Sequence, residues 1–185
     1  MGLQDGPGQI GQLLDKQQIT ELLYRYCRGI DRLDWDLVRD CYHVDAVDDH
    51  DGTFRGGTDA FIDHFRSRLE RDVAASMHTI GNVLIELDGD VAGCESHIVG
   101  RLLRRGSTEP DRVFVAAARY VDRMERRGGG PWRIARRTVL WEWTSAEPLA
   151  AARPEPGAHR GRRDRSDASY EALSVTTPGQ NLQVP

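Results

Sequence analysis

The chain has 185 residues, of which 39% are hydrophobic and 29% are charged, and its formal net charge is −4 at pH 7. This length suits one domain with a substantial core, and no apolar stretch approaches the length of a membrane-spanning helix. The acidic balance provides no broad attraction for nucleic acid or for an anionic membrane surface, so we expect neither as a partner.

Three cysteines, Cys27, Cys41 and Cys94, are widely spaced and lack the CxxC spacing of a zinc site or a redox pair. Reduced thiols, together with an N-terminus that has no secretory pattern, favour a cytoplasmic protein. We expect neither a metal nor another cofactor.

The first apolar periodicity, over residues 15–31, predicts a helix that begins at Asp15, with Gln18 in the position of a capping box. Asp31 falls at the edge of its apolar arc, so we expect a partly buried carboxylate near the helix end. A second, short helix is predicted over residues 35–42.

Residues 44–57 predict a β-hairpin that turns at Asp51 and Gly52, and residues 58–73 predict a third amphipathic helix. The VDDHD run of this hairpin has the residue types of a metal site. Successive side chains on a strand point to opposite faces, however, which favours a simple hairpin rim. His50 is a candidate for closing the mouth of a pocket.

Four β-rich runs, at residues 77–87, 92–103, 112–124 and 132–143, predict an antiparallel meander. Helices followed by a curved sheet define an α+β fold, in which the helices cover one face of the sheet and leave a cavity. We expect one domain over residues 10–146. Residues 147–185, rich in Pro, Arg and small polar residues, predict a mobile tail with at most a short helix near residues 169–174.

Alternation along these strands selects candidate substrate-binding residues. Asn82 is expected to share the face of His78, and His97 on the next strand is a candidate contact for a substrate oxygen. On the last strand Arg137 and Trp141 share a face, where an arginine could anchor a carboxylate or enolate beside an apolar wall. The opposite parity, with this face turned away from the pocket, remains open.

The segments LLDKQQITELLYRYCRGIDRLDWD, YHVDAVDDHDGTFRGG, SMHTIGNVLIELDGD and PWRIARRTVLWEW resemble, in this order, the SnoaL-like branch of the nuclear transport factor 2-like superfamily. This branch includes scytalone dehydratase, hexachlorocyclohexane dehydrochlorinase, bile acid dehydratase and polyketide cyclases. The resemblance covers about residues 10–146. It implies a cone-shaped α+β barrel, a curved antiparallel sheet wrapped around three N-terminal helices. It also implies a homodimer or homotrimer and a small hydrophobic or polycyclic substrate.

The same resemblance implies an acid–base pair. In the dehydratases and the dehydrochlorinase, a first-helix aspartate in a Gly-hydrophobe-Asp context supports a histidine that starts the strand after the third helix. The matching positions here are Asp31, in Gly-Ile-Asp, and His78, in Met-His-Thr. Tyr26, five residues before the aspartate, matches a tyrosine of the bile acid enzyme. Tyr24 lies in the direction of Asp31 on the helix and is a candidate substrate contact.

An imidazole can remove a proton near neutral pH, and a carboxylate on its other nitrogen fixes its tautomer. We therefore expect a cofactor-independent lyase of the dehydratase type, or an isomerase, with His78 as base, Asp31 orienting it and Tyr26 polarising the substrate. Three alternatives stay open. In the first, Asp31 only caps the helix or forms a local salt bridge, and His78 is a hydrogen-bonded core histidine. In the second, the domain is a non-catalytic ligand-binding or subunit-interaction module. In the third, it is a polyketide-type cyclase that needs the aspartate but not necessarily the histidine.

Overall fold

The computed structural model describes residues 7–105, 112–149 and 157–174. The elements in chain order are α1 (Pro7–Arg32), α2 (Trp35–Asp40), β1 (Tyr42–Asp49), β2 (Arg55–Gly57), α3 (Thr58–Asp72), β3 (Val73–Asp88), β4 (Val91–Arg104), β5 (Arg112–Arg126), β6 (Trp132–Pro148) and α4 (Ala168–Leu173). Three helices thus precede the long meander, and the α+β class is confirmed.

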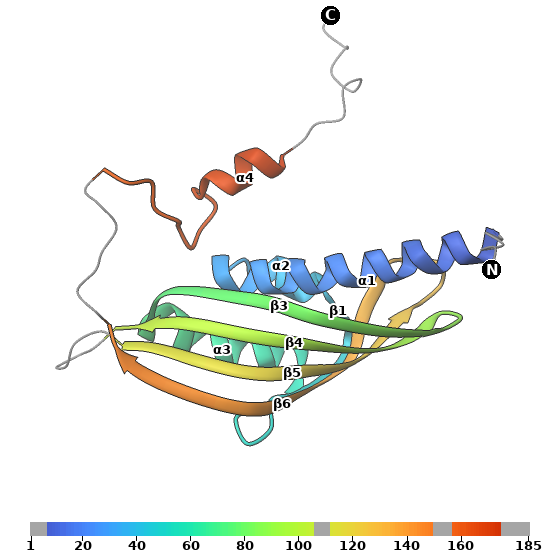
Figure 1. Cartoon of the computed structure of the whole chain (residues 1–185), viewed down its shortest axis with the longest axis horizontal. Helices are drawn as coiled ribbons and strands as arrows, with labels where there is room; N and C mark the ends of the chain where they lie inside the picture. The colour runs from blue at the N-terminus through green and yellow to red at the C-terminus, as the bar shows by residue number, and fades with distance from the viewer. Residues whose placement is uncertain (1–6, 106–111, 150–156, 175–185) are drawn as a thin grey trace, which may run out of the picture.

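The strands form one curved sheet in the order β2-β1-β6-β5-β4-β3, and helices α1, α2 and α3 cover its concave face (Figure 1). Pairing is antiparallel except between β1 and β6, which run parallel. Because β2 and β3 lie at opposite edges, the sheet forms an open cone rather than a closed barrel. The open side leaves room for a cavity between sheet and helices.

The predicted start of the first helix is wrong, because α1 begins at Pro7 rather than at Asp15. Asp15 lies inside the helix, where its Oδ1 accepts hydrogen bonds from Nη1 of Arg126 at 2.6 Å and from Nε1 of Trp132 at 2.9 Å. An aspartate with a glutamine three residues on satisfies a capping pattern even when its carboxylate serves a tertiary contact. Here Asp15 ties α1 to the sheet.

The end of α1 is shaped by a close approach of α2. A Cβ atom built on Gly29 would lie only 2.7 Å from Cγ2 of Val38, so glycine lets the two helices meet. The helix ends at Arg32, the following residue Leu33 has a left-handed φ of 55°, and the N–H of Asp34 donates to the carbonyl of Gly29 at 2.9 Å. This geometry sets the position of Asp31 in the last turn.

Strand β3 carries a bulge that changes which residues face inward. Ile80 pairs with Ile98 and Val83 with Ser96, so β3 advances by three residues where β4 advances by two. Before the bulge, the inward-facing side chains are His78 and Ile80. After it, the inward-facing side chain is Val83, so Asn82 is exposed.

Residues 157–174 dock against the corner formed by α1, α2 and α3. The Arg163 guanidinium donates to the carbonyl oxygens of Asp31 at 3.3 Å, Leu69 at 3.0 Å and Val73 at 2.8 Å. In α4, the Tyr170 hydroxyl donates to Asp34 at 2.9 Å. The mobility predicted for residues 147–185 stays a prediction, and residues 150–156 and 175–185 lie outside the described ranges.

The three cysteines are buried free thiols. Burial raises the pKa of the Cys27 thiol to about 12 and that of the Cys41 thiol to about 11. Both thiols are therefore protonated near neutral pH and are poor nucleophiles. Among the described residues, no helix combines the length and apolar content needed to cross a bilayer.

Candidate active site

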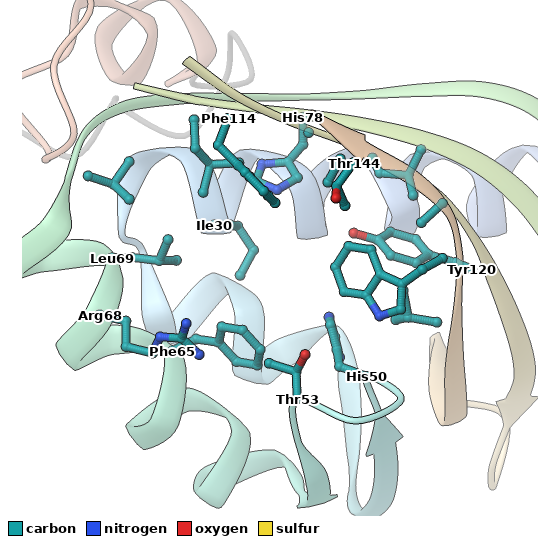
Figure 2. A pocket seen from close by; sticks show the side chains of 18 of the residues that line it. Ile30, His50, Thr53, Phe65, Arg68, Leu69, His78, Phe114, Tyr120 and Thr144 are labelled. Carbon is teal, nitrogen blue, oxygen red and sulfur yellow. The ribbon is translucent and has the colours of Figure 1, made fainter. Parts of the chain in front are cut away.

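A cavity of about 360 Å³ lies between the concave face of the sheet and helices α1 and α3 (Figure 2). Its volume is in the range of small-molecule sites. Aromatic rings form much of its wall, namely Tyr26, Phe61, Phe65, Phe114, Tyr120 and Trp141. Polar side chains interrupt this wall, namely His50, Thr53, Arg68, Asp72, His78, Arg104 and Thr144.

Asp31 and His78 meet at this cavity from different elements. Oδ1 of Asp31, in the last turn of α1, lies 2.7 Å from Nδ1 of His78 near the start of β3. The backbone N–H of His78 donates to Oδ2 of the same carboxylate at 2.8 Å. The carboxylate thus holds both the backbone and the ring of His78, which fixes the direction of the imidazole.

The protonation of this pair follows from its hydrogen bonds. Burial acts to raise the pKa of Asp31, but the hydrogen bonds and charge of His78 outweigh it and hold the pKa below its ordinary value. The ionised carboxylate can only accept, so Nδ1 of His78 carries its proton toward Asp31. In the neutral ring, Nε2 is then the free, basic nitrogen, and Figure 2 shows the ring projecting into the cavity.

Gly100 on β4 makes room for this ring. It pairs with His78 across the two strands, and a Cβ atom on it would lie 3.2 Å from both Cδ2 and Nε2 of the imidazole. Only glycine leaves the ring edge without a close contact here.

Tyr26 lies in the cavity wall within a cluster of aromatic rings. Its ring centroid is 5.9 Å from that of Tyr42 and 5.8 Å from that of Tyr120, both in edge-to-face arrangements. Burial raises the pKa of Tyr26 well above its ordinary value, although the Arg137 guanidinium partly opposes this. The hydroxyl therefore remains protonated and can donate, but it is not a base.

His50 lies in the cavity wall rather than at an open rim, with only 7% of its surface exposed. Its Nδ1 contacts the buried carboxylate of Asp48, which also accepts a hydrogen bond from the Tyr42 hydroxyl at 2.7 Å. The hairpin itself is present, with β1 and β2 antiparallel. Within the described ranges, no three His, Cys, Asp or Glu side chains gather as metal ligands.

Arg137 faces the interior but does not line the cavity, which corrects the prediction of a substrate anchor. Its Nε and Nη2 donate to the two oxygens of Asp122 at 2.8 and 2.7 Å, and it is fully buried. The guanidinium lies 4.2 Å from the ring centroid of Tyr26 and 3.9 Å from that of Tyr120. It therefore supports the back of the aromatic wall.

Three further candidates lie away from the cavity. Tyr24 is 53% exposed on the outer side of α1, because a residue two positions from Tyr26 lies on a different helix face. Asn82 is turned outward by the bulge in β3. His97 is exposed because Ile98 and Ser96 take the inward positions of β4. Trp141, in contrast, lines the cavity, which the sequence left open because either strand parity was possible.

Sequence reasoning missed several lining residues. Phe61 and Phe65 lie on the amphipathic helix predicted over residues 58–73, and helical spacing alone does not separate a core face from a cavity wall. Phe114 and Gly100 lie on predicted strands, where a glycine in an apolar alternation was the available signal of a close approach. Arg68 and Asp72 on α3 and Arg104 on β4 add two positive charges and one negative charge to the cavity lining.

An open cone of sheet, covered by three helices around an apolar cavity, defines a protein of the nuclear transport factor 2-like superfamily. Within that class, residues 11–138 match the family model of the SnoaL-like domain. The chain belongs to the SnoaL-like family. A comparison with curated proteins gave no significant match.

Solved structures show the same fold at low sequence identity. The hexachlorocyclohexane dehydrochlorinase LinA-type3 from Novosphingobium barchaimii LL02 has a TM-score of 0.67 at 18% identity, covering 80% of this chain and 99% of its own. A candidate scytalone dehydratase from Novosphingobium aromaticivorans has a TM-score of 0.64 at 19% identity, with 80% and 97% coverage. A variant of Rv3472, a protein of unknown function from Mycobacterium tuberculosis, has a TM-score of 0.62 at 28% identity, with 74% and 76% coverage.

Proposed function

We propose that this protein is a cofactor-independent lyase that eliminates water, or a comparable leaving group, from a small apolar or polycyclic substrate. The observation that carries this proposal is the Asp31–His78 pair: Nδ1 of the imidazole is held 2.7 Å from a buried carboxylate, and its ring projects into an apolar cavity. Isomerisation uses the same first proton transfer and belongs to the same proposal.

The reaction begins with removal of a proton from carbon. Nε2 of His78 takes a proton next to a carbonyl group, and the carbanion or enolate that develops expels a leaving group from the neighbouring carbon. Asp31 stabilises the imidazolium that forms and keeps the ring in the productive tautomer. Tyr26, whose hydroxyl stays protonated because burial raises its pKa, is the donor proposed for the developing oxyanion.

The cavity favours substrates with extended apolar surface. Aromatic walls bury flat rings well, and a volume of about 360 Å³ suits a molecule of two or three fused rings. The structural relatives support the proposed type of reaction, because a dehydrochlorinase and a dehydratase both carry out eliminations.

The test is a panel of cyclic β-hydroxy and β-halo carbonyl compounds, with elimination followed by absorbance of the conjugated product. We expect kcat/KM to fall about 10²- to 10⁴-fold in His78→Ala and in Asp31→Asn, because positioned proton transfer supplies a factor of that size. His97→Ala is the matched control, since His97 is a histidine on the outer face of the sheet. Elimination at the wild-type rate in both His78→Ala and Asp31→Asn would contradict the proposed mechanism.

A further inference from the structure

A second imidazole–carboxylate pair faces the cavity, and the mechanism above leaves it unused. His50, directly after β1, and His78, on β3, lie on opposite sides of the cavity (Figure 2). The ring of His50 is packed among aromatic side chains, with centroids 5.3 Å from Phe61, 5.0 Å from Phe65 and 6.4 Å from Trp141. The substrate space therefore lies between two imidazoles.

The carboxylate behind His50 has few other partners. Asp48 is 1% exposed and accepts from the Tyr42 hydroxyl at 2.7 Å as well as from Nδ1 of His50. The nearby buried cation, Arg137, already forms a two-bond ion pair with Asp122. His50 is thus the group placed to balance Asp48, and its proton on Nδ1 points to that carboxylate.

A polar pair at this point needs an explanation beyond packing. The neighbouring wall is aromatic, and apolar residues at positions 48 and 50 would fill the same space without the cost of burying a carboxylate and an imidazole. Nδ1 is bound to Asp48, so Nε2 is the nitrogen left for the cavity. A proton carried there can be delivered to an atom that leaves the substrate.

We propose that His50 is the general acid of the elimination. This assignment rests on the proposed function and adds the proton donor that an alcohol substrate requires. His78 takes the proton from carbon, and the C–H electron pair becomes the new π bond. The C–O bond breaks with its electrons on oxygen, and that oxygen takes the Nε2 proton of His50 and leaves as water. His78 ends protonated and His50 neutral, and proton exchange with solvent restores both.

The proposal identifies the preferred substrate class. Hydroxide is a poor leaving group and needs protonation, whereas chloride leaves as a stable anion without it. The natural substrate is therefore a β-hydroxy carbonyl compound, with the acidic C–H directed to His78 and the hydroxyl to His50. A halide analogue of the same skeleton would depend on His78 alone.

The test compares two leaving groups on one carbon skeleton. For wild type, His50→Gln, Asp48→Asn and His78→Ala, kcat/KM is measured on a β-hydroxy ketone and on its β-chloro analogue. We expect His50→Gln to lose about 10²-fold or more on the hydroxy compound and less than about 5-fold on the chloro compound. Asp48→Asn, which keeps the side-chain shape, should show the same selective loss at about 10-fold. His78→Ala should lose activity on both.

Each outcome separates the two proposals. Equal losses on both substrates in His50→Gln and Asp48→Asn, or no loss on either, overturn the assignment of His50 and leave the role of His78 standing. A His78→Ala variant that keeps both activities, or a wild type with neither activity, overturns the proposed function and this assignment with it. The ratio of the two activities within one preparation is independent of the folded fraction, so partial misfolding of a variant does not imitate the effect.

Discussion

Arg137 and Asp31 are both buried charged residues, but their partners give them different roles. Asp31 holds an imidazole that projects into the cavity, so its charge is available to a reaction. Arg137 is sealed behind Tyr26 and Tyr120, and one edge of its guanidinium, Nε and Nη2, is bound to the two oxygens of Asp122. Burial alone therefore does not single out a candidate catalytic residue; contact with the cavity is needed as well.

The Arg137–Asp122 pair should be a stability determinant. In Arg137→Met the Asp122 carboxylate is left buried without its counter-ion, which costs about 3–5 kcal/mol. Urea unfolding followed by tryptophan fluorescence should show this loss, and the double variant Arg137→Met/Asp122→Leu should regain part of it. A single variant as stable as wild type would contradict this role.

At the scale of elements, Gly100 on β4 leaves space for the imidazole of His78 on the neighbouring strand β3. Gly100→Ala places a methyl group 3.2 Å from Nε2 of His78, so the ring or the strand must shift by a few tenths of an ångström. Because small displacements of a catalytic group are costly, we expect kcat to fall about 3- to 10-fold with little change in stability.

The control for this prediction lies on the same strand. A Cβ atom on Gly93 meets no atom within 4 Å, so Gly93→Ala reports the general effect of alanine in β4. Steady-state kinetics and thermal unfolding of both variants make the comparison. Equal kcat values for the two variants would show that the space beside His78 is not required.

The order of elements and the Asp31–His78 contact could be predicted, because both rest on local patterns and on a family resemblance. Asn82 could not be placed correctly, since a bulge changes strand parity without a clear local signal. The partner of Arg137 could not be predicted either: Asp122 lies on the adjacent strand, and pairing depends on a register that one sequence does not contain.

At the scale of the whole molecule, residues 157–174, which follow the sheet in the chain, contact the end of α1 that carries Asp31. Arg163 bonds to the carbonyl of Asp31 and to those of Leu69 and Val73, and so joins the ends of α1 and α3 with the start of β3. These are the elements that position Asp31 and His78, which couples the docked segment to the geometry of the pair.

Loss of this contact should loosen the site. We expect Arg163→Ala to lower the free energy of unfolding by about 1.5–3 kcal/mol, the range for hydrogen bonds to a charged group. Amide hydrogen exchange at the end of α1 should also become faster. Arg160→Ala, at an exposed position in the same segment, is the control. Unchanged exchange at residues 29–34 in Arg163→Ala would contradict this coupling.

The most direct measurement of the central claim is chemical rescue of His78→Ala. On an elimination substrate identified with the panel, we predict that this variant is nearly inactive and that added imidazole restores turnover in proportion to its concentration, because the small base enters the space left by the ring. A His78→Ala variant that turns over as fast as wild type without imidazole would contradict the claim that this side chain removes the proton.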